Sequence, residues 1–178
     1  VLFWLLVAAP GRKPGQMRPM VLWPALVGVI GTLALVPLQA SFLGGGTWAA
    51  AANPELIGLV ADTPLGTSVQ LRVVGLALIF LALAPVQWAK YVAAFGTMLV
   101  AQSFSLVGHT LSEPRAFLSV LISIHILCIA FWIGSLGPLH RIVDQVSARQ
   151  AGEVAERFGR IAVWAVAVLV VSGGILLI

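Results

Sequence analysis

Charged residues are scarce in this sequence: they make up 9% of its 178 residues, whereas 60% of the residues are hydrophobic. About a quarter of the residues of a typical soluble domain are charged, so this composition excludes an ordinary soluble protein. The few basic residues lie mostly between apolar runs, where membrane topology accounts for them. The formal net charge of +4 therefore does not indicate a nucleic-acid-binding surface.

Cysteine is also nearly absent, because Cys128 is the only one in the sequence. A single cysteine excludes an internal disulfide framework, and its place inside an apolar run says little about the redox compartment. The sequence has neither a nucleotide-binding glycine loop nor a hydrolytic motif. We therefore expect that the protein is not an enzyme and that this chain does not drive transport with ATP.

What the sequence does contain is a series of apolar runs that approach or exceed the ~20 residues needed to span a bilayer as a helix. The pattern predicts an all-α fold, a polytopic transmembrane helical bundle with about five full spans and a partial one at the N-terminus. The full spans are predicted at about 20–42, 68–84, 91–110, 116–136 and from 161 onward.

The two ends of the sequence lack the flanks of complete spans. Residues 1–9 (VLFWLLVAA) are too short to cross a bilayer, and the last apolar run stops without a polar flank. We therefore expect residues 1–178 to form a single transmembrane domain that is a fragment of a longer chain and part of a larger bundle.

The orientation follows from lysine and arginine, eight of which lie in or beside the connections 10–19, 85–90 and 140–160. The positive-inside rule places these three connections in the cytoplasm. The acidic connection 43–67 and the turn 111–115 then face outward, and the alternation agrees with five spans. The expected location is the inner membrane of a bacterium.

Two connections show helical patterns of their own. Asn53-Pro54-Glu55 predicts the start of a short interfacial helix, because asparagine suits the N-cap and proline the first turn. Residues 140–160 are charged and mildly amphipathic, which predicts a separate surface helix before the fifth span begins near Ile161.

Polar or soft-ligand side chains form one stripe on each of the third and fourth predicted spans. Their spacings of four, three and four, and of three, four and three, keep each set on one helical face. The short turn between the spans makes them antiparallel neighbours, so the two faces could meet. The stripes are Met98, Gln102, Ser105 and His109 on the third span, and His125, Cys128, Trp132 and Ser135 on the fourth.

The two histidines of these stripes differ in depth. His109 lies within about one turn of the outer end of its span, whereas His125 lies about ten residues into the next, or ~15 Å deep. Their offset of ~13 Å is too long for one ion held by ~2 Å bonds, unless a kink or ligands from other helices intervene. We therefore predict an outer station at His109 and a midplane station at His125, the latter with Met98 or Cys128.

The donor types of these stripes favour a soft metal. Imidazole suits copper and zinc, while thioether and thiol groups favour Cu(I), so copper is the expected metal. An ionisable group in the hydrocarbon indicates function by default. Gln102 and Ser105 are more typical of hydrogen bonds between helices, and Trp132 of close packing, so they are assigned as a supporting face.

Two other functions fit the same residues. A buried histidine could ligate haem in a b-type cytochrome or another membrane electron carrier, although the ~13 Å offset argues against both histidines binding one haem. Alternatively, the histidines could pack against partners in a structural subunit of a membrane complex.

The second half of the chain resembles the CopD family of bacterial inner-membrane copper-resistance proteins. The resemblance covers roughly residues 100–178 and depends on "LVGHT", "ISIHILCIAFWIGSLGPL" and "ERFGRIAVWAVAVLVVSGGI". These contain the family's Gly-His pair, mid-helix His, Trp-x-Gly-x-Leu segment, Arg-Phe-led helix and Ser-Gly pair. Ser135 departs from the family pattern, where a second glycine is frequent. The resemblance implies copper handling across the inner membrane, alongside a periplasmic copper-binding partner of the CopC type.

Overall fold

The computed structural model describes residues 1–7, 18–84, 86, 88–108 and 114–177. Its regular structure in these ranges is entirely helical, which confirms the predicted fold class. The helices are α1 (Leu2–Leu6), α2 (Arg18–Leu43), α3 (Trp48–Ala51), α4 (Pro54–Ala61), α5 (Pro64–Phe80), η2 (Leu81–Leu83), α6 (Ala89–Ser103), η3 (Phe104–Leu106), α7 (Arg115–Val143) and α8 (Ala148–Leu176).

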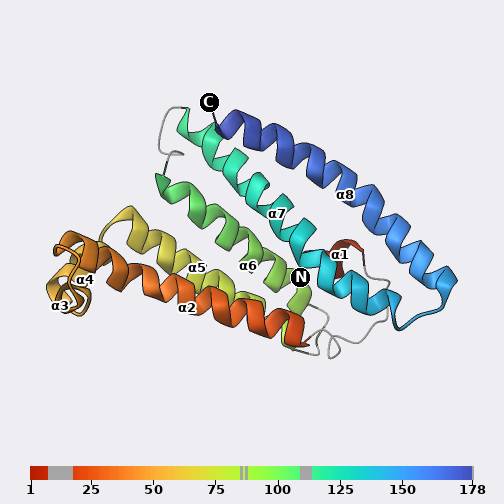
Figure 1. Ribbon diagram of the computed structural model, residues 1–178, viewed down its shortest axis with the longest axis horizontal. Helices are drawn as coiled ribbons and strands as arrows, with labels where there is room; N and C mark the ends of the chain where they lie inside the picture. The colour runs from red at the N-terminus through yellow and green to blue at the C-terminus, as the bar shows by residue number, and fades with distance from the viewer. Residues whose placement is uncertain (8–17, 85, 87, 109–113, 178) are drawn as a thin grey trace.

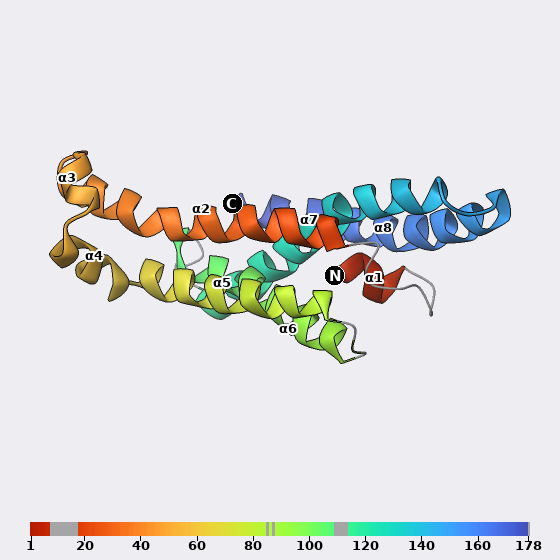
Figure 2. The same ribbon diagram turned by 90° about the horizontal axis from the view of Figure 1, so that it is seen from below.

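The long helices run along the molecule and follow one another across it in chain order, from α2 through α5, α6 and α7 to α8 (Figure 1). Consecutive helices of this series pack against each other, and α1 packs against α7. Figure 2 shows that α5 and α6 lie in a different layer from α2 and α8. The connections that produce this sequential arrangement are short except for the one between α2 and α5, which contains α3 and α4.

Among the described residues, four helical segments are long and apolar enough to cross a membrane. They are Pro19–Leu43, Pro64–Leu83, Arg115–Val143 and Ala148–Leu176. The third predicted span corresponds to α6, which has 15 residues and is extended to Leu106 by η3. α6 packs between α5 and α7 and runs alongside these longer helices through the apolar part of the bundle. The protein is thus a multi-pass membrane protein.

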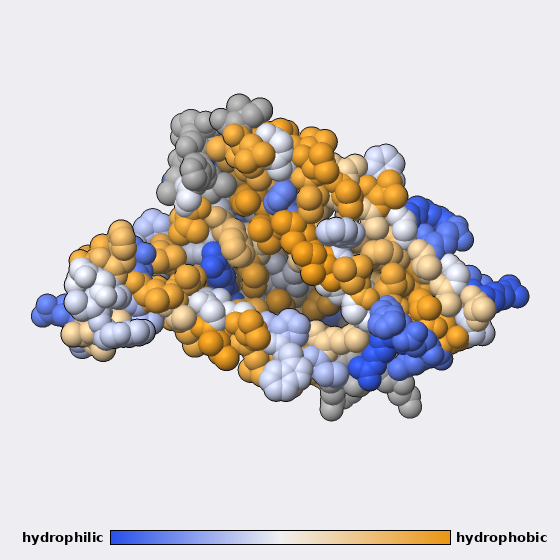
Figure 3. Space-filling view, viewed as in Figure 1, coloured by the Kyte–Doolittle hydropathy of each residue, from blue (hydrophilic) through white to orange (hydrophobic). Residues whose placement is uncertain are grey.

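The surface agrees with this placement. Hydrophobic side chains cover much of the face in Figure 3, and hydrophilic ones are most concentrated on its right-hand side. Large apolar side chains such as Val27, Ile30 and Val170 are more than half exposed on the spans. In a bilayer these side chains contact lipid, so their exposure carries no hydrophobic penalty.

The prediction of a separate surface helix at 140–160 is wrong. α7 continues through Pro138 to Val143, and α8 then runs unbroken from the charged segment into the apolar one. The apolar stripe of the charged half, including Val154 and Phe158, packs on α7 around Phe131, so this half needs no membrane surface to cover it. The α7–α8 hairpin therefore extends beyond the ends of the other helices (Figures 1 and 2).

The short helix predicted at Asn53-Pro54-Glu55 is confirmed. Asn53 caps α4, and its Oδ1 accepts a hydrogen bond of 2.9 Å from the amide of Glu55, with Pro54 in the first turn. Thr47 caps α3 in the same way. The tight turn before α3 uses Gly45 and Gly46 at φ of +80°, a conformation that favours glycine.

The backbones of α5 and α6 approach each other closely at Gly75 and Gly96. A Cβ atom added to Gly75 would lie 2.6 Å from the carbonyl oxygen of Gly96, and one added to Gly96 would lie 2.5 Å from that of Gly75. Only glycine at both positions permits this approach. Small residues commonly allow membrane helices to come this close.

Candidate metal-binding site in the membrane

His125 lies ten residues into α7, which places it roughly 15 Å from the N-terminal end of that helix. Its half-buried ring faces α8, where Nδ1 lies 2.9 Å from the Oγ atom of Ser172. Gly173 makes room for the ring, because a Cβ atom there would lie 3.1 Å from Cε1 of His125. α7 and α8 therefore hold the imidazole between them.

The rest of the α7 stripe has mixed surroundings. Cys128, a half-buried free thiol, lies on the face of His125 because residues three apart on a helix are neighbours. Trp132 is 43% exposed. Ser135 is fully buried and donates its hydroxyl proton to the carbonyl of Phe131 in its own helix, so it serves packing.

The α6 stripe makes its contacts elsewhere on α7. The Nε2 atom of Gln102 donates to the hydroxyls of Ser105 and Ser119, both at 2.8 Å, and its Oε1 accepts from Ser123 at 2.9 Å. Gln102 thus joins the C-terminal end of α6 to the N-terminal part of α7. This is the interhelical role expected for its side chain.

These contacts show that the two stripes do not meet at His125. Ser123 points toward α6, and His125, two residues further along, points about 200° away from it around α7, toward α8. The register set by Gln102 places Met98, one turn deeper on α6, at the depth of His125 but on the other side of α7. Met98 is 57% exposed. Met98 and His125 are thus at the same level along the two helices, as predicted, but their side chains do not face each other.

The other two histidines of the sequence are His109 and His140. The predicted outer station, His109, lies outside the described residues; the preceding Gly108 has a φ of +83°. His140 is exposed at the charged end of α7, with Nε2 3.6 Å from Asp144 Oδ2. His140 is therefore a surface residue.

Arg72 was not identified as a site residue from the sequence. It lies within α5, where its Nε atom donates to Ser103 Oγ at 2.8 Å and its guanidinium lies 3.9 Å from the centre of the Phe104 ring. Ser68 donates to the carbonyl of Ser103 at 2.7 Å. These contacts hold the last turn of α6, whose terminal carbonyls favour a nearby cation. Arg72 could have been found from the sequence, because it is a charged residue within the apolar run 68–84.

The described residues contain no group of three or more histidine, cysteine, aspartate or glutamate side chains that could hold a metal ion. His125 and Cys128 supply one imidazole and one thiol on a single face. That donor pair fits a soft monovalent ion better than a hard cation, which prefers oxygen ligands.

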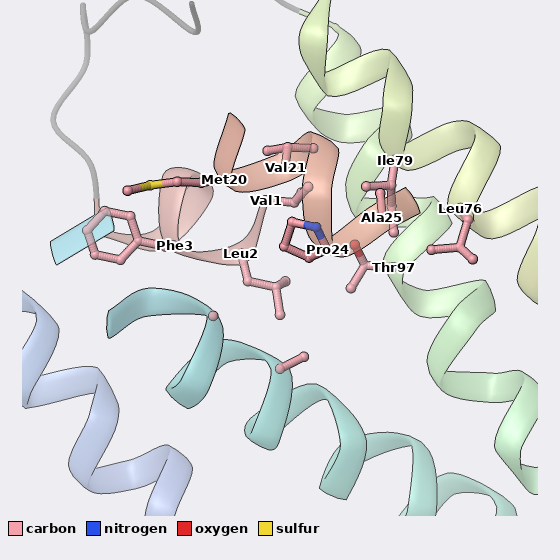
Figure 4. Close-up of a pocket in the computed structure, with 12 residues that line it drawn as sticks. Val1, Leu2, Phe3, Met20, Val21, Pro24, Ala25, Leu76, Ile79 and Thr97 are labelled. Atoms are coloured by element: carbon pink, nitrogen blue, oxygen red, sulfur yellow. The ribbon is translucent and has the colours of Figure 1, made fainter. Parts of the chain in front are cut away.

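A separate pocket of about 270 Å³ lies among α1, α2, α5, α6 and α7. Figure 4 shows a wall of carbon side chains with Thr97 as a polar member. The Thr97 hydroxyl already donates to the carbonyl of Ala93 at 2.9 Å. The pocket does not include His125, and it offers no soft metal ligand apart from Met20.

Comparison with known proteins gives one family match. The model described as "Copper resistance protein D-like, N-terminal domain" matches residues 1–114. The match ends in the turn before α7 and overlaps the resemblance at 100–178 only over 100–114, which includes Gly108-His109. Neither the curated proteins nor the solved structures gave a match.

Proposed function

Because the chain belongs to the copper resistance protein D-like family, and is thus a membrane protein related to copper resistance, we propose that it binds copper within the bilayer and helps move it across. In this proposal His125 is the midplane station, Cys128 is a nearby soft ligand, and the membrane is the bacterial inner membrane.

One observation carries the proposal: an imidazole lies at mid-depth in an apolar helix, held between α7 and α8. Burying an ionisable group in hydrocarbon costs free energy, so such a residue within a span indicates a functional site by default. Its pairing with a thiol on the same face favours Cu(I) over Cu(II). Met98 lies on the other side of α7 and is not assigned to this station.

Copper enters from the outward side in this proposal, through the predicted outer station at His109. The cytoplasmic ends are those that carry most lysine and arginine, including the α7–α8 hairpin. A periplasmic copper-binding protein of the CopC type would deliver the ion.

The test replaces His125 with alanine in the purified protein and measures bound copper by elemental analysis. We expect loss of the midplane copper and altered copper accumulation in cells that express the variant. His140→Ala is the matched control, because it removes an exposed histidine from the same helix. Unchanged copper in both assays for His125→Ala would refute the proposal.

The same preparations decide the haem alternative. An absorption spectrum with a strong Soret band that is lost in His125→Ala would assign this histidine to haem iron instead. A spectrum without that band, together with copper lost only from His125→Ala, supports the copper station.

A further inference from the structure

The contact between His125 and Ser172 determines which ring nitrogen is free. The Ser172 hydroxyl has a single proton, and its oxygen lies 3.2 Å from the carbonyl of Leu169 and 2.9 Å from His125 Nδ1. If the proton goes to the carbonyl, the oxygen accepts a hydrogen bond from Nδ1–H. If it goes to Nδ1 instead, the imidazole carries its own proton on Nε2.

The surroundings favour the first arrangement. Among the described residues, Nε2 of His125 has no hydrogen-bond partner, whereas Nδ1 has Ser172. A proton on Nε2 would leave an unpaired N–H donor in an apolar span. Unpaired donors are rarer in proteins than unpaired acceptors, because the lone pair costs less to leave unfilled. If Ser172 donates to the carbonyl of Leu169, the proton of His125 is on Nδ1 and bonded to Ser172. Only the lone pair of Nε2 is then without a partner among the described residues.

We infer that Ser172 is a positioning residue that holds neutral His125 in the Nδ1–H tautomer and thereby presents the Nε2 lone pair as the metal-binding atom. The inference depends on the proposed copper station. A metal-ligating histidine commonly donates its other N–H to a fixed acceptor, which orients the ring and makes it more basic. Here a serine hydroxyl on α8 takes the place of the usual carboxylate or carbonyl.

Gly173 completes this arrangement. Because its Cα hydrogen leaves the ring edge free, the imidazole can approach α8 closely enough for a 2.9 Å bond to Ser172. An added Cβ at the neighbouring Gly174 would have no atom within 4 Å. Of these two glycines, only Gly173 therefore lies against the imidazole ring. One helix therefore supplies both the hydrogen-bond acceptor and the space.

The first test is made without copper. The full chain is prepared with ¹⁵N-labelled histidine in lipid nanodiscs, and the ring nitrogens are observed by NMR at alkaline pH, where imidazole is neutral. Single alanine variants of the three histidines assign the signals. We expect protonated Nδ1 and unprotonated Nε2 at His125 in the wild type; the opposite pattern would overturn the inference.

The second test uses variants. Ser172→Ala should shift His125 toward the Nε2–H tautomer and weaken Cu(I) binding, measured by competition with a chelator, by about 10–100-fold. Ser172→Thr, which keeps the hydroxyl, should restore both. Ser135→Ala removes a buried serine of α7 that bonds only its own helix, and should change neither. A Ser172→Ala protein with wild-type tautomer or wild-type affinity would overturn the inference.

The two proposals fail separately. If His125→Ala binds Cu(I) as tightly as the wild type, the copper station is wrong whatever the tautomer. If His125→Ala loses Cu(I) but the wild-type ring carries its proton on Nε2, the station stands and the role of Ser172 is wrong. The NMR measurement on the wild type requires no variant to fold other than those used for assignment.

Discussion

Two helix pairs in this protein use glycine for opposite purposes. Between α5 and α6, Gly75 and Gly96 face each other and bring the two backbones together until no side chain fits. Between α7 and α8, Gly173 faces an imidazole and leaves just enough room for it. The same type of residue thus lets two backbones touch in one contact and makes room for a side chain in the other.

A second difference lies in the polar groups at these contacts. At the α5–α6 contact, the guanidinium of Arg72 has its Nε bonded to Ser103 and its face on the Phe104 ring. At the α7–α8 contact, His125 uses one nitrogen and leaves the other without a hydrogen bond in the described part of the chain. A group that is held on several sides stabilises helix packing, whereas a free lone pair can bind a ligand.

The largest expected effect comes from filling the closed contact. Gly96→Ala places a methyl group against the backbone of α5 and should lower the free energy of unfolding by about 1–3 kcal/mol. The measurement is unfolding by denaturing detergent, followed by circular dichroism. Gly134→Ala on α7 is the control, because nothing lies within 4 Å of its added Cβ. Equal midpoints for the two variants would show that α5 and α6 are not in close contact.

Removing the cation from the same pair should cost somewhat less. Arg72→Met loses the hydrogen bond to Ser103 and the contact with Phe104, so we expect a loss of about 1–2 kcal/mol. Amide hydrogen exchange in η3 should also accelerate. The matched control is Arg141→Met, which removes an exposed arginine near the end of α7. A loss no greater than in this control would contradict a structural role for Arg72.

The smallest expected effect is at the open contact. Gly173→Ala brings a methyl group to 3.1 Å from the ring, so the imidazole must move by a few tenths of an ångström. We expect less than about 1 kcal/mol of destabilisation and a Cu(I) affinity lowered by less than about tenfold. Gly174→Ala should leave the affinity unchanged. Identical affinities for the two variants would indicate that the ring is not confined by α8.

Most of the spans could be predicted from the sequence. The run 20–42 became α2 and the run 68–84 became α5 with η2, because in lipid a backbone must satisfy its hydrogen bonds internally as a helix. The end of α6 at Ser103 could not be predicted. Its position is associated with contacts from Arg72 and Ser68, more than thirty residues away in sequence. The unbroken α8 was missed because its charged half packs on α7 instead of on a membrane surface.

The position of His125 along its helix could be predicted from the sequence, but the direction of its side chain could not. Counting residues at a fixed rise places His125 near mid-membrane, and Gln102 at the level of Ser119 and Ser123 agrees with that register. Which neighbour the imidazole faces depends on how α7 is rotated. That rotation follows from contacts such as the one with Ser172, 47 residues away, which periodicity within one helix cannot reveal.

The unbroken course of α8 has a mechanical consequence. From Ala148 at the charged end to Ser172 the helix is a single rod, roughly 35 Å long at the usual rise per residue. A tilt of about 5° around the charged end would displace Ser172 by roughly 3 Å, as much as the hydrogen bond to His125 is long. The helix is thus a lever arm: a rotation of its charged end reaches Ser172, and with it the imidazole of His125, with no loop between them to absorb it.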